Sequence, residues 1–291
     1  MNIGIIGAGS IGLLAGAYLG RDHDVHMYVR RPSQLEVMRK EGIHCSALDS
    51  PTSVNVHLVD EGISAHDLLF VTVKQHQLPD VLKQLPTTCP VLFLQNGMGH
   101  LDLLPVETHT CWVGVVEHGA RKTGEAAVEH LGKGKIQVAG LNKKEEVMWW
   151  VHQLSSDDFP VLYHEDYEEI LAAKLVVNTV INPLTAIFQV QNKQIVQNSS
   201  IQNIAYVLCE EACRVLNRPV TSEWERVQRV ALNTGENQSS MLKDILNGRR
   251  TEVDAISGYI IRRSQSPVPY HEFVLQAVHA LEKERGEKGY E

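Results

Sequence analysis

A glycine-rich turn lies directly after the first apolar run of the chain and limits how the N-terminal part can fold. The run Ile3–Ile6 has the character of a buried strand, and an amphipathic segment, Ile11–Leu19, follows the turn. In the pattern G-x-G-x-x-G, the glycines permit a tight turn, a close approach to a pyrophosphate and close helix–strand packing, while the helix start offers N–H groups to phosphate. The alternative is a turn with a purely structural role. The pattern predicts a dinucleotide site at Gly7, Ala8, Gly9, Ser10, Ile11 and Gly12.

The two halves of the chain differ in their hydrophobic patterns. Short apolar runs separated by helical segments fill the first half, at Ile3–Ile6, Val25–Val29, Leu68–Val73, Val91–Leu94, Trp112–Val116 and Ile136–Ala139. Such runs indicate strands buried on both faces, and hence a mostly parallel sheet. From about Tyr167 the chain favours helices, at 167–188, 199–216, 222–233, 252–264 and 271–285. We predict an α/β fold with two domains, a Rossmann-type dinucleotide-binding domain over residues 1–165 and an all-helical domain over residues 166–291.

Charge and cysteine content exclude several classes of protein. Lys and Arg number 27 against 35 Asp and Glu, a formal net charge of −8, which argues against a nucleic-acid binder. The five cysteines form no C-x-x-C pair, and Cys209 and Cys213 are expected to be buried thiols rather than metal ligands. No signal peptide or membrane-spanning stretch is recognisable. We expect a cytoplasmic protein, a monomer or homodimer, with no metal, nucleic acid or membrane as partner.

The end of the second strand bears on the choice of cofactor. An NAD-binding domain usually has Asp or Glu about 20 residues beyond the glycines, where it accepts from the ribose hydroxyls. Here Val29 is followed by Arg30 and Arg31, and no carboxylate is present. The arginine fork suits a 2′-phosphate. A solvated arginine pair is the alternative, but the pattern favours NADP(H), with Arg30 as the contact.

Polar residues also follow two later strands. Lys74 comes directly after Leu68–Val73, and Asn96 follows Val91–Leu94 in the sequence Gln-Asn-Gly-Met-Gly. Singly, such residues are usually a solvated lysine and a turn. In open α/β sheets, however, ligands bind beyond the carboxyl ends of the strands. We therefore expect Arg30, Lys74 and Asn96 to face one ligand site.

The segment Leu171–Phe188 is apolar nearly all round, which is typical of a buried helix. Lys174, Asn178 and Asn182 nevertheless recur at a spacing of four and form one polar stripe. Buried polar groups cost roughly 1–3 kcal/mol each when they lack a partner, so the stripe is expected to face partners, water or a ligand. Burial also disfavours the charged form of a lysine and makes its ammonium a better proton donor. The alternative is a lysine reaching solvent beside two asparagines that link helices.

A second polar cluster lies near the C-terminal helices. It contains Ser239 and Ser240, and then Thr251 and Glu252 at the start of a predicted helix. Thr251 and Glu252 suit a helix N-terminus, where a threonine caps N–H groups and a carboxylate meets the helix dipole. Ligand binding explains the same residues equally well, and the spacing does not separate the two roles.

Together these segments resemble the 2-dehydropantoate 2-reductase (ketopantoate reductase) family. The resemblance runs in order from residue 4 to about residue 263, and the helix with its Asn-Pro-Leu-Thr-Ala ending is highly specific to the family. It implies an NADPH-dependent reductase of pantothenate and coenzyme A biosynthesis, with a Rossmann-type domain and a C-terminal domain like that of 6-phosphogluconate dehydrogenase. The matching motifs are Gly7–Gly12, Val73-Lys74, Gln95–Gly99, Lys174–Ala186, Ser239–Leu242 and Thr251–Asp254.

The resemblance also implies roles for individual residues. Lys174 would protonate the substrate carbonyl as the general acid, with Asn178 and Asn182 orienting the lysine and the substrate hydroxyls. Ser240 would bind the substrate carboxylate, and Glu252 would accept from substrate hydroxyls. Further contacts to the cofactor would come from Asn96, which would also touch substrate, from Lys74 and from Arg30.

Two other functions remain open at this point. One is the reduction of another branched 2-keto acid, and the other is a non-catalytic NADP(H)-binding sensor, which could dispense with Lys174. The chain also departs from the family in Ser264–Pro269, between the last two helices, which looks shorter than the usual loop. A shorter loop there is expected to affect packing or oligomerisation.

Overall fold

The computed structural model describes residues 1–286, and the chain divides into two compact units. The first, here called the sheet unit, comprises Met1–Gln95 and Leu103–Ile170. The second, the helical unit, comprises Asn96–Asp102 and the chain from Leu171 onward. The helical unit thus includes a segment from the middle of the predicted dinucleotide domain. The last five residues, part of the predicted helical domain, lie outside the described range.

The sheet unit is built on an eight-stranded sheet, which confirms the predicted α/β fold. The strand order is β11-β10-β7-β6-β5-β1-β2-β4, and all neighbouring strands pair in parallel except β10 with β7. Every predicted apolar run forms a strand, whereas the sheet-edge strands β4 and β11 were not predicted. The strands are β1 (Asn2–Ile6), β2 (Asp24–Val29), β4 (Asn55–Leu58), β5 (Leu68–Val71), β6 (Val91–Phe93), β7 (Cys111–Val116), β10 (Ile136–Gly140) and β11 (Val161–Tyr163).

Helices cover this sheet, and its core is aromatic and aliphatic. Trp112, Phe70 and Phe93 are buried on strands β7, β5 and β6. The first helix runs from the glycine turn back along the sheet, as the parallel β1–β2 pairing requires. The helices are α1 (Ser10–Leu19), α2 (Pro32–Glu41), α3 (Leu78–Leu82) and α4 (Lys144–Leu154), with short 3₁₀ turns at Val59–Glu61, Gln75–Gln77 and Leu101–Leu103.

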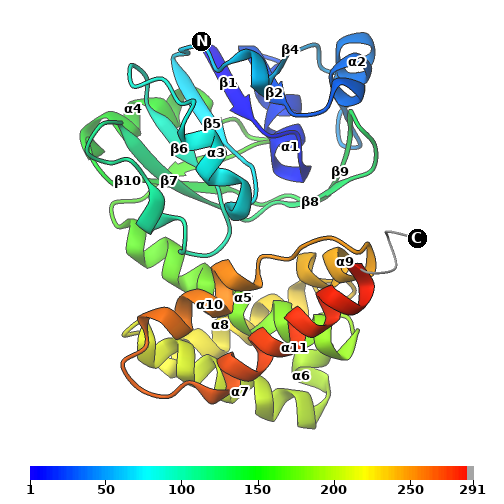
Figure 1. Cartoon of the computed structure of the whole chain (residues 1–291), viewed down its shortest axis with the longest axis vertical. Helices are drawn as coiled ribbons and strands as arrows, with labels where there is room; N and C mark the ends of the chain where they lie inside the picture. The colour runs from blue at the N-terminus through cyan, green and yellow to red at the C-terminus, as the bar shows by residue number, and fades with distance from the viewer. Residues whose placement is uncertain (287–291) are drawn as a thin grey trace. The chain divides into compact units, whose positions relative to one another are not determined.

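A second, three-stranded sheet lies against α1. It consists of β3 (His44–Cys45), β9 (Ala127–Gly132) and β8 (Gly119–Lys122), in that order. Strands β8 and β9 form an antiparallel hairpin, which Figure 1 shows running from the β7 end of the sheet towards α2. The hairpin carries polar side chains on both sides of its turn, and no apolar run in the sequence predicted it.

The helical unit contains the predicted long helix at its predicted bounds. Helix α5 spans Tyr167–Phe188. Four further predicted helices are present with shifts of a few residues, and the short helices α6 and α9 were not predicted. Figure 1 shows α10 and α11 side by side in this unit. The elements are α6 (Gln194–Gln197), α7 (Ser199–Val215), α8 (Val220–Asn233), α9 (Ser240–Leu246), α10 (Val253–Arg263) and α11 (Pro269–Gly286).

The link between α10 and α11 is short and anchored at both sides. The backbone carbonyl of Pro267 accepts a hydrogen bond from Arg214 on α7, at 2.8 Å. At the start of α11, the Glu211 carboxylate accepts from the backbone N–H groups of Tyr270 and His271 and from the His271 ring. Glu211 thus occupies the N-cap role for α11, so the segment noted in the sequence as short is fastened to α7.

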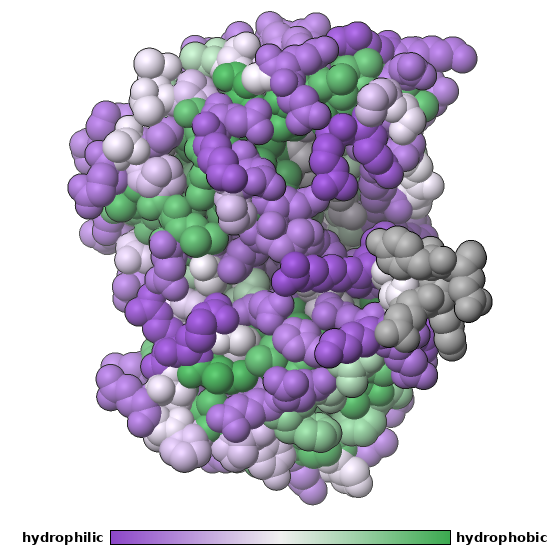
Figure 2. Space-filling view, viewed as in Figure 1, coloured by the Kyte–Doolittle hydropathy of each residue, from purple (hydrophilic) through white to green (hydrophobic). Residues whose placement is uncertain are grey.

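Helix α5 is the one described helix whose length and composition would let it cross a membrane. Of its most apolar 18-residue window, 78% is buried inside the protein, as expected of a core helix. On the face shown in Figure 2, hydrophilic residues predominate and hydrophobic residues appear in separate patches. All five cysteines are free and buried, and the Sγ atoms of Cys209 and Cys213 lie 3.9 Å apart, in line with the buried-thiol prediction.

Candidate active site

The glycine turn has the geometry that the sequence pattern predicts. Gly7 adopts φ +104°, a left-handed conformation that favours glycine, and a Cβ atom on Gly12 would lie 1.8 Å from the Gly7 carbonyl oxygen. A Cβ atom on Gly9 would meet nothing within 4 Å, so the backbone is open on that side. The turn therefore offers the accessible backbone that a pyrophosphate needs, and the residues present fit a dinucleotide.

The start of α1 adds to this fit. Gly9 is the N-cap, and among the described residues no side chain caps it and no acidic residue lies in the first turn. The N–H groups there remain available to an anion. Thr72, which the sequence did not single out, donates to the carbonyl oxygens of Ile6 (3.1 Å) and Gly7 (2.8 Å) and ties the turn to the end of β5.

The two arginines after β2 differ in their surroundings. The Arg30 side chain is exposed, and the structure records no hydrogen bond or ion pair between it and residues 1–286. Arg31 forms an ion pair with Glu125 of the β8–β9 hairpin. A carboxylate is thus present near the glycine turn after all, although it comes from a segment about 95 residues further along the chain.

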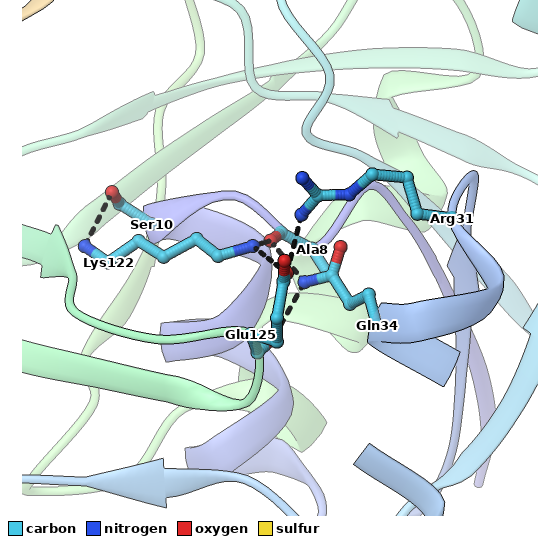
Figure 3. Close-up of polar contacts among 6 residues, drawn as sticks. All are labelled: Ala8, Ser10, Arg31, Gln34, Lys122 and Glu125. Atoms are coloured by element: carbon cyan, nitrogen blue, oxygen red, sulfur yellow. Dashed lines mark hydrogen bonds and ion pairs between the residues drawn. The ribbon is translucent and has the colours of Figure 1, made fainter. Parts of the chain in front are cut away.

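The β8–β9 hairpin is fastened to the glycine turn by contacts that local sequence did not reveal (Figure 3). The backbone N–H of Lys122 donates to Ser10 Oγ at 3.1 Å, and its Nζ donates to the Ala8 carbonyl at 3.2 Å. Gln34, buried in the first turn of α2, donates to the carbonyls of Ala8 and Glu125. Burial lowers the pKa of Lys122, and its hydrogen bond to Glu125 partly offsets that effect.

Lys74 and Gln95 lie at neighbouring strand ends of the sheet unit. Lys74 is partly exposed, follows β5 and begins the Gln75–Gln77 turn, and its backbone N–H donates to Gln77 Oε1. Gln95 is buried and donates from Nε2 to the carbonyls of Val71 (2.9 Å) and Val73 (3.0 Å). Gln95 therefore holds the chain between β5 and Lys74 in place.

In the helical unit, two predicted site residues meet although 156 positions separate them. Asn96 Nδ2 donates to Glu252 Oε2 at 2.9 Å, and both side chains are partly exposed. Gly97 adopts φ +79°, and a Cβ atom on it would lie 2.3 Å from the Ala255 carbonyl oxygen. The close approach that Gly97 permits presses the Asn96 loop against the start of α10 and thereby brings the two residues together.

The polar stripe of α5 is present as predicted. Lys174 and Asn178 are partly exposed in a run where residues 170–186 are otherwise buried, and Asn182 is 8% exposed. Thr185, one turn further on, donates to Ser239 Oγ at 2.7 Å. The stripe is thus accessible at Lys174 and Asn178 and becomes buried at Asn182.

The structure separates the roles of the neighbouring polar residues. Ser239 Oγ accepts from Thr185 and from the Leu242 N–H and so caps α9, whereas Ser240 is exposed. Thr251 Oγ1 accepts from the Val253 N–H, which is a capping contact at the start of α10. Glu252 makes no such cap and bonds Asn96 instead. The sequence left the roles of Thr251 and Glu252 open. In the structure, Thr251 caps the start of α10, whereas the Glu252 carboxylate accepts a hydrogen bond from Asn96.

Within residues 1–286, no group of three or more His, Cys, Asp or Glu side chains is arranged to hold a metal ion. The polar chemistry of the described chain is therefore that of two sets. One set surrounds the glycine turn of the sheet unit and is suited to a phosphorylated nucleotide. The other lies in the helical unit and comprises the α5 stripe of Lys174, Asn178 and Asn182 and the hydrogen-bonded pair Asn96 and Glu252.

Comparison with known proteins agrees with this chemistry. Residues 3–143 match the family model "Ketopantoate reductase PanE/ApbA", and residues 166–282 match "Ketopantoate reductase PanE/ApbA C terminal". A 2-dehydropantoate 2-reductase of Bacillus subtilis (strain 168) is 41% identical over 97% of this chain and 98% of its own length.

Solved structures give the same fold. The crystal structure of a probable 2-dehydropantoate 2-reductase from Bacillus subtilis aligns with a TM-score of 0.85 at 38% identity, covering 97% of this chain and 100% of that one. A D-mandelate dehydrogenase in complex with NADH and anilino(oxo)acetate aligns with a TM-score of 0.91, covering 98% and 99% of the two chains. At 23% identity, this second likeness concerns the fold alone.

Proposed function

Because the chain belongs to the ketopantoate reductase family, we propose that it reduces 2-dehydropantoate (ketopantoate) to pantoate with NADPH. The protein is an oxidoreductase of pantothenate and hence coenzyme A biosynthesis. The observation that carries the proposal is the stripe of Lys174, Asn178 and Asn182, which keeps an ammonium and one amide partly exposed on an otherwise buried helix and a second amide, that of Asn182, buried beside them. A protein that only bound the nucleotide would have no need of that stripe.

Lys174 acts in this proposal as the general acid. Bound NADPH supplies a hydride from C4 of its nicotinamide to the carbonyl carbon of the substrate. Negative charge then grows on the carbonyl oxygen, and an ammonium hydrogen-bonded to that oxygen stabilises the charge and donates the proton. Asn178 and Asn182, one and two turns along α5, orient the lysine and the substrate hydroxyl.

The remaining substrate contacts come from both segments of the helical unit. Glu252 accepts from the substrate hydroxyl, and the exposed Ser240 donates to the substrate carboxylate. Asn96 contacts substrate and cofactor, and its hydrogen bond to Glu252 supports a shared site for the two side chains. We assign substrate binding to residues 166–291 together with the loop Asn96–Asp102, which belongs to the same unit.

The dinucleotide is assigned to residues 1–165. The open backbone at Gly9 and the uncapped start of α1 support binding of the pyrophosphate by residues 7–12. Arg30 holds the 2′-phosphate, and Lys74 contacts the ribose or phosphate side of the cofactor. We also propose that the enzyme is cytoplasmic and acts on its small-molecule substrate as a monomer or homodimer. Analytical ultracentrifugation would measure the oligomeric state.

The direct test is oxidation of NADPH by the purified protein with ketopantoate, followed by the nicotinamide absorbance. The assay runs beside NADH and a panel of other branched 2-keto acids. Rapid turnover with ketopantoate and NADPH is the expected result. Faster turnover of another keto acid would overturn the substrate assignment, and tight NADPH binding without any turnover would indicate a sensor.

Replacing Arg30 with alanine is expected to weaken NADPH binding by roughly 10- to 100-fold, because the change removes charged hydrogen bonds to the 2′-phosphate. NADH binding should change little, since NADH carries no phosphate there. Titration of nicotinamide fluorescence measures both affinities. Arg21→Ala removes the same charge from another exposed position of the sheet unit and serves as the control. Equal losses for the two nucleotides would remove Arg30 from the phosphate site.

A further inference from the structure

One carboxylate oxygen beside the glycine turn is held by two cations. Glu125 Oε2 lies 2.5 Å from the Arg31 guanidinium and 3.1 Å from Lys122 Nζ, as Figure 3 shows. The Glu125 side chain is 33% exposed, and that of Lys122 is 26% exposed. The protein therefore holds an anion of its own between two cations, next to the turn to which the nucleotide is assigned.

The position of this carboxylate is set by contacts that do not depend on its charge. Gln34 Nε2 donates to the backbone carbonyls of both Glu125 and Ala8, and the Lys122 N–H donates to Ser10 Oγ. These contacts fasten the tip of the β8–β9 hairpin to the glycine turn and to α2. The cluster is thus a built arrangement of three segments rather than a chance surface pair.

The two cations suit phosphate as well as carboxylate. A guanidinium binds either group through the same fork of N–H donors, and the end of β2 is where such folds distinguish a 2′-phosphate from a 2′-hydroxyl. The Arg31–Glu125 pair is half-exposed and hence weak. A phosphate monoester carries a charge of about −1.5 to −2 near neutral pH, against −1 for a carboxylate, so it competes well for the same cations.

We propose that the Glu125 carboxylate occupies an anion subsite for the cofactor's 2′-phosphate in the nucleotide-free protein and leaves Arg31 and Lys122 when NADP(H) binds. Glu125 is then a determinant of the preference between NADP(H) and NAD(H). Only the phosphorylated nucleotide makes new ion pairs with Arg31 and Lys122 that compensate for the loss of the Glu125 contacts. This inference rests on the proposed use of NADPH and adds three residues, Arg31, Lys122 and Glu125, to its recognition.

The state of Lys122 agrees with this arrangement. Burial lowers the pKa of the lysine, and the hydrogen bond and charge of Glu125 act in the opposite direction. The carboxylate thus favours the charged ammonium while no nucleotide is present. An incoming phosphate would meet a cation that is already protonated and would take over the role of the carboxylate.

The test measures binding of two fragments by calorimetry, adenosine 2′,5′-bisphosphate with the 2′-phosphate and ADP without it. Glu125→Gln is expected to tighten binding of the bisphosphate roughly fivefold, the size of one half-exposed ion pair, and to leave ADP unchanged. Glu129→Gln is the matched control, because Glu129 pairs with Arg121 on the same hairpin and its loss changes the net charge equally. In an Arg31→Ala background, Glu125→Gln should tighten binding less, because only Lys122 is then released from the carboxylate.

Three results would overturn the inference. Unchanged affinity for the bisphosphate would mean that Glu125 does not compete with it. Equal tightening for ADP, or the same tightening in Glu129→Gln, would indicate a general effect of charge. Weaker binding of both fragments would show that Glu125 accepts from the ribose instead. Because no substrate enters these titrations, their outcome is distinguishable from a failure of the protein to reduce ketopantoate.

Discussion

Replacing Lys174 with alanine is expected to lower the turnover of ketopantoate by roughly 10²- to 10⁴-fold, the contribution of a positioned general acid. NADPH affinity should be nearly kept, because the glycine turn to which we assign the nucleotide is built from other residues in the sheet unit. Steady-state kinetics and a nucleotide titration measure the two effects separately. Unchanged turnover would remove Lys174 from the proton-transfer step.

Two further variants separate proton donation from charge and from folding. Lys174→Arg keeps a cation but holds its proton too tightly to donate it, so turnover should stay low. Added small primary amines should partly restore the activity of Lys174→Ala, which a purely structural loss would not allow. Lys193→Ala is the control, because Lys193 lies in the same unit and pairs with the exposed Glu236. That variant should retain full turnover.

Acidification is expected to destabilise the protein steeply between about pH 6.5 and pH 4. Three buried histidines, His66, His100 and His118, have a pKa of about 4 in the folded chain, in each case mainly because burial disfavours the charged ring. Nearby histidines lower the pKa of His66 and His118 further. The unfolded chain binds these protons near pH 6.5, so their contribution to stability is complete above that pH and is lost as the pH falls.

The hydrogen bonds of two of these rings explain why they resist a second proton. His66 donates from Nδ1 to Asn2 Oδ1, which leaves Nε2 to accept from the Tyr28 hydroxyl at 2.8 Å. His118 Nδ1 accepts from the Gly134 N–H at 3.1 Å and so carries no proton. Charging either ring would require one of these accepted hydrogen bonds to be given up in a buried site.

Chemical denaturation at several pH values measures the effect. Each ring contributes a slope of about 1.4 kcal/mol per pH unit to the free energy of unfolding between the two pKa values, so three rings give about 4 kcal/mol per unit. His118→Phe should remove one third of the slope, since phenylalanine can keep the stacking on Phe159. His44→Gln changes an exposed ring and should leave the slope unaltered. A flat profile between pH 6.5 and 5 would contradict the prediction.

Much of the architecture was predictable because its signals are local. The glycine turn, the apolar runs and the spacing of Lys174, Asn178 and Asn182 each depend on neighbours within a few residues. Helix α5 accordingly begins and ends where the sequence indicates. The edge strands β4 and β11 are partly exposed, so they lack the continuous buried apolar run that marks the equally short strands β5 and β6.

The parts that were missed depend on long-range contacts. The strands of the β8–β9 hairpin mix polar and apolar residues, so neither forms an apolar run, and Gln34, Lys122 and Glu125 meet only once the chain has folded. The sequence shows two arginines after β2, but it does not show that Arg31 forms an ion pair with Glu125, which is distant in the sequence. Likewise, the sequence did not distinguish helix capping from ligand binding for Thr251 and Glu252. The structure does, because Thr251 caps α10 and Glu252 contacts Asn96.

The discontinuous composition of the helical unit has a consequence for protein engineering. Asn96–Asp102 belongs to that unit although it is encoded between two strands of the other, and it is joined there through Asn96 to Glu252 and through Asp102 to Arg263. A chimaera made by a single crossover near residue 165 would pair each C-terminal half with a foreign loop. Under the proposed substrate assignment, exchange of substrate preference between such reductases therefore requires two grafts, the C-terminal half and the seven-residue loop bonded to it.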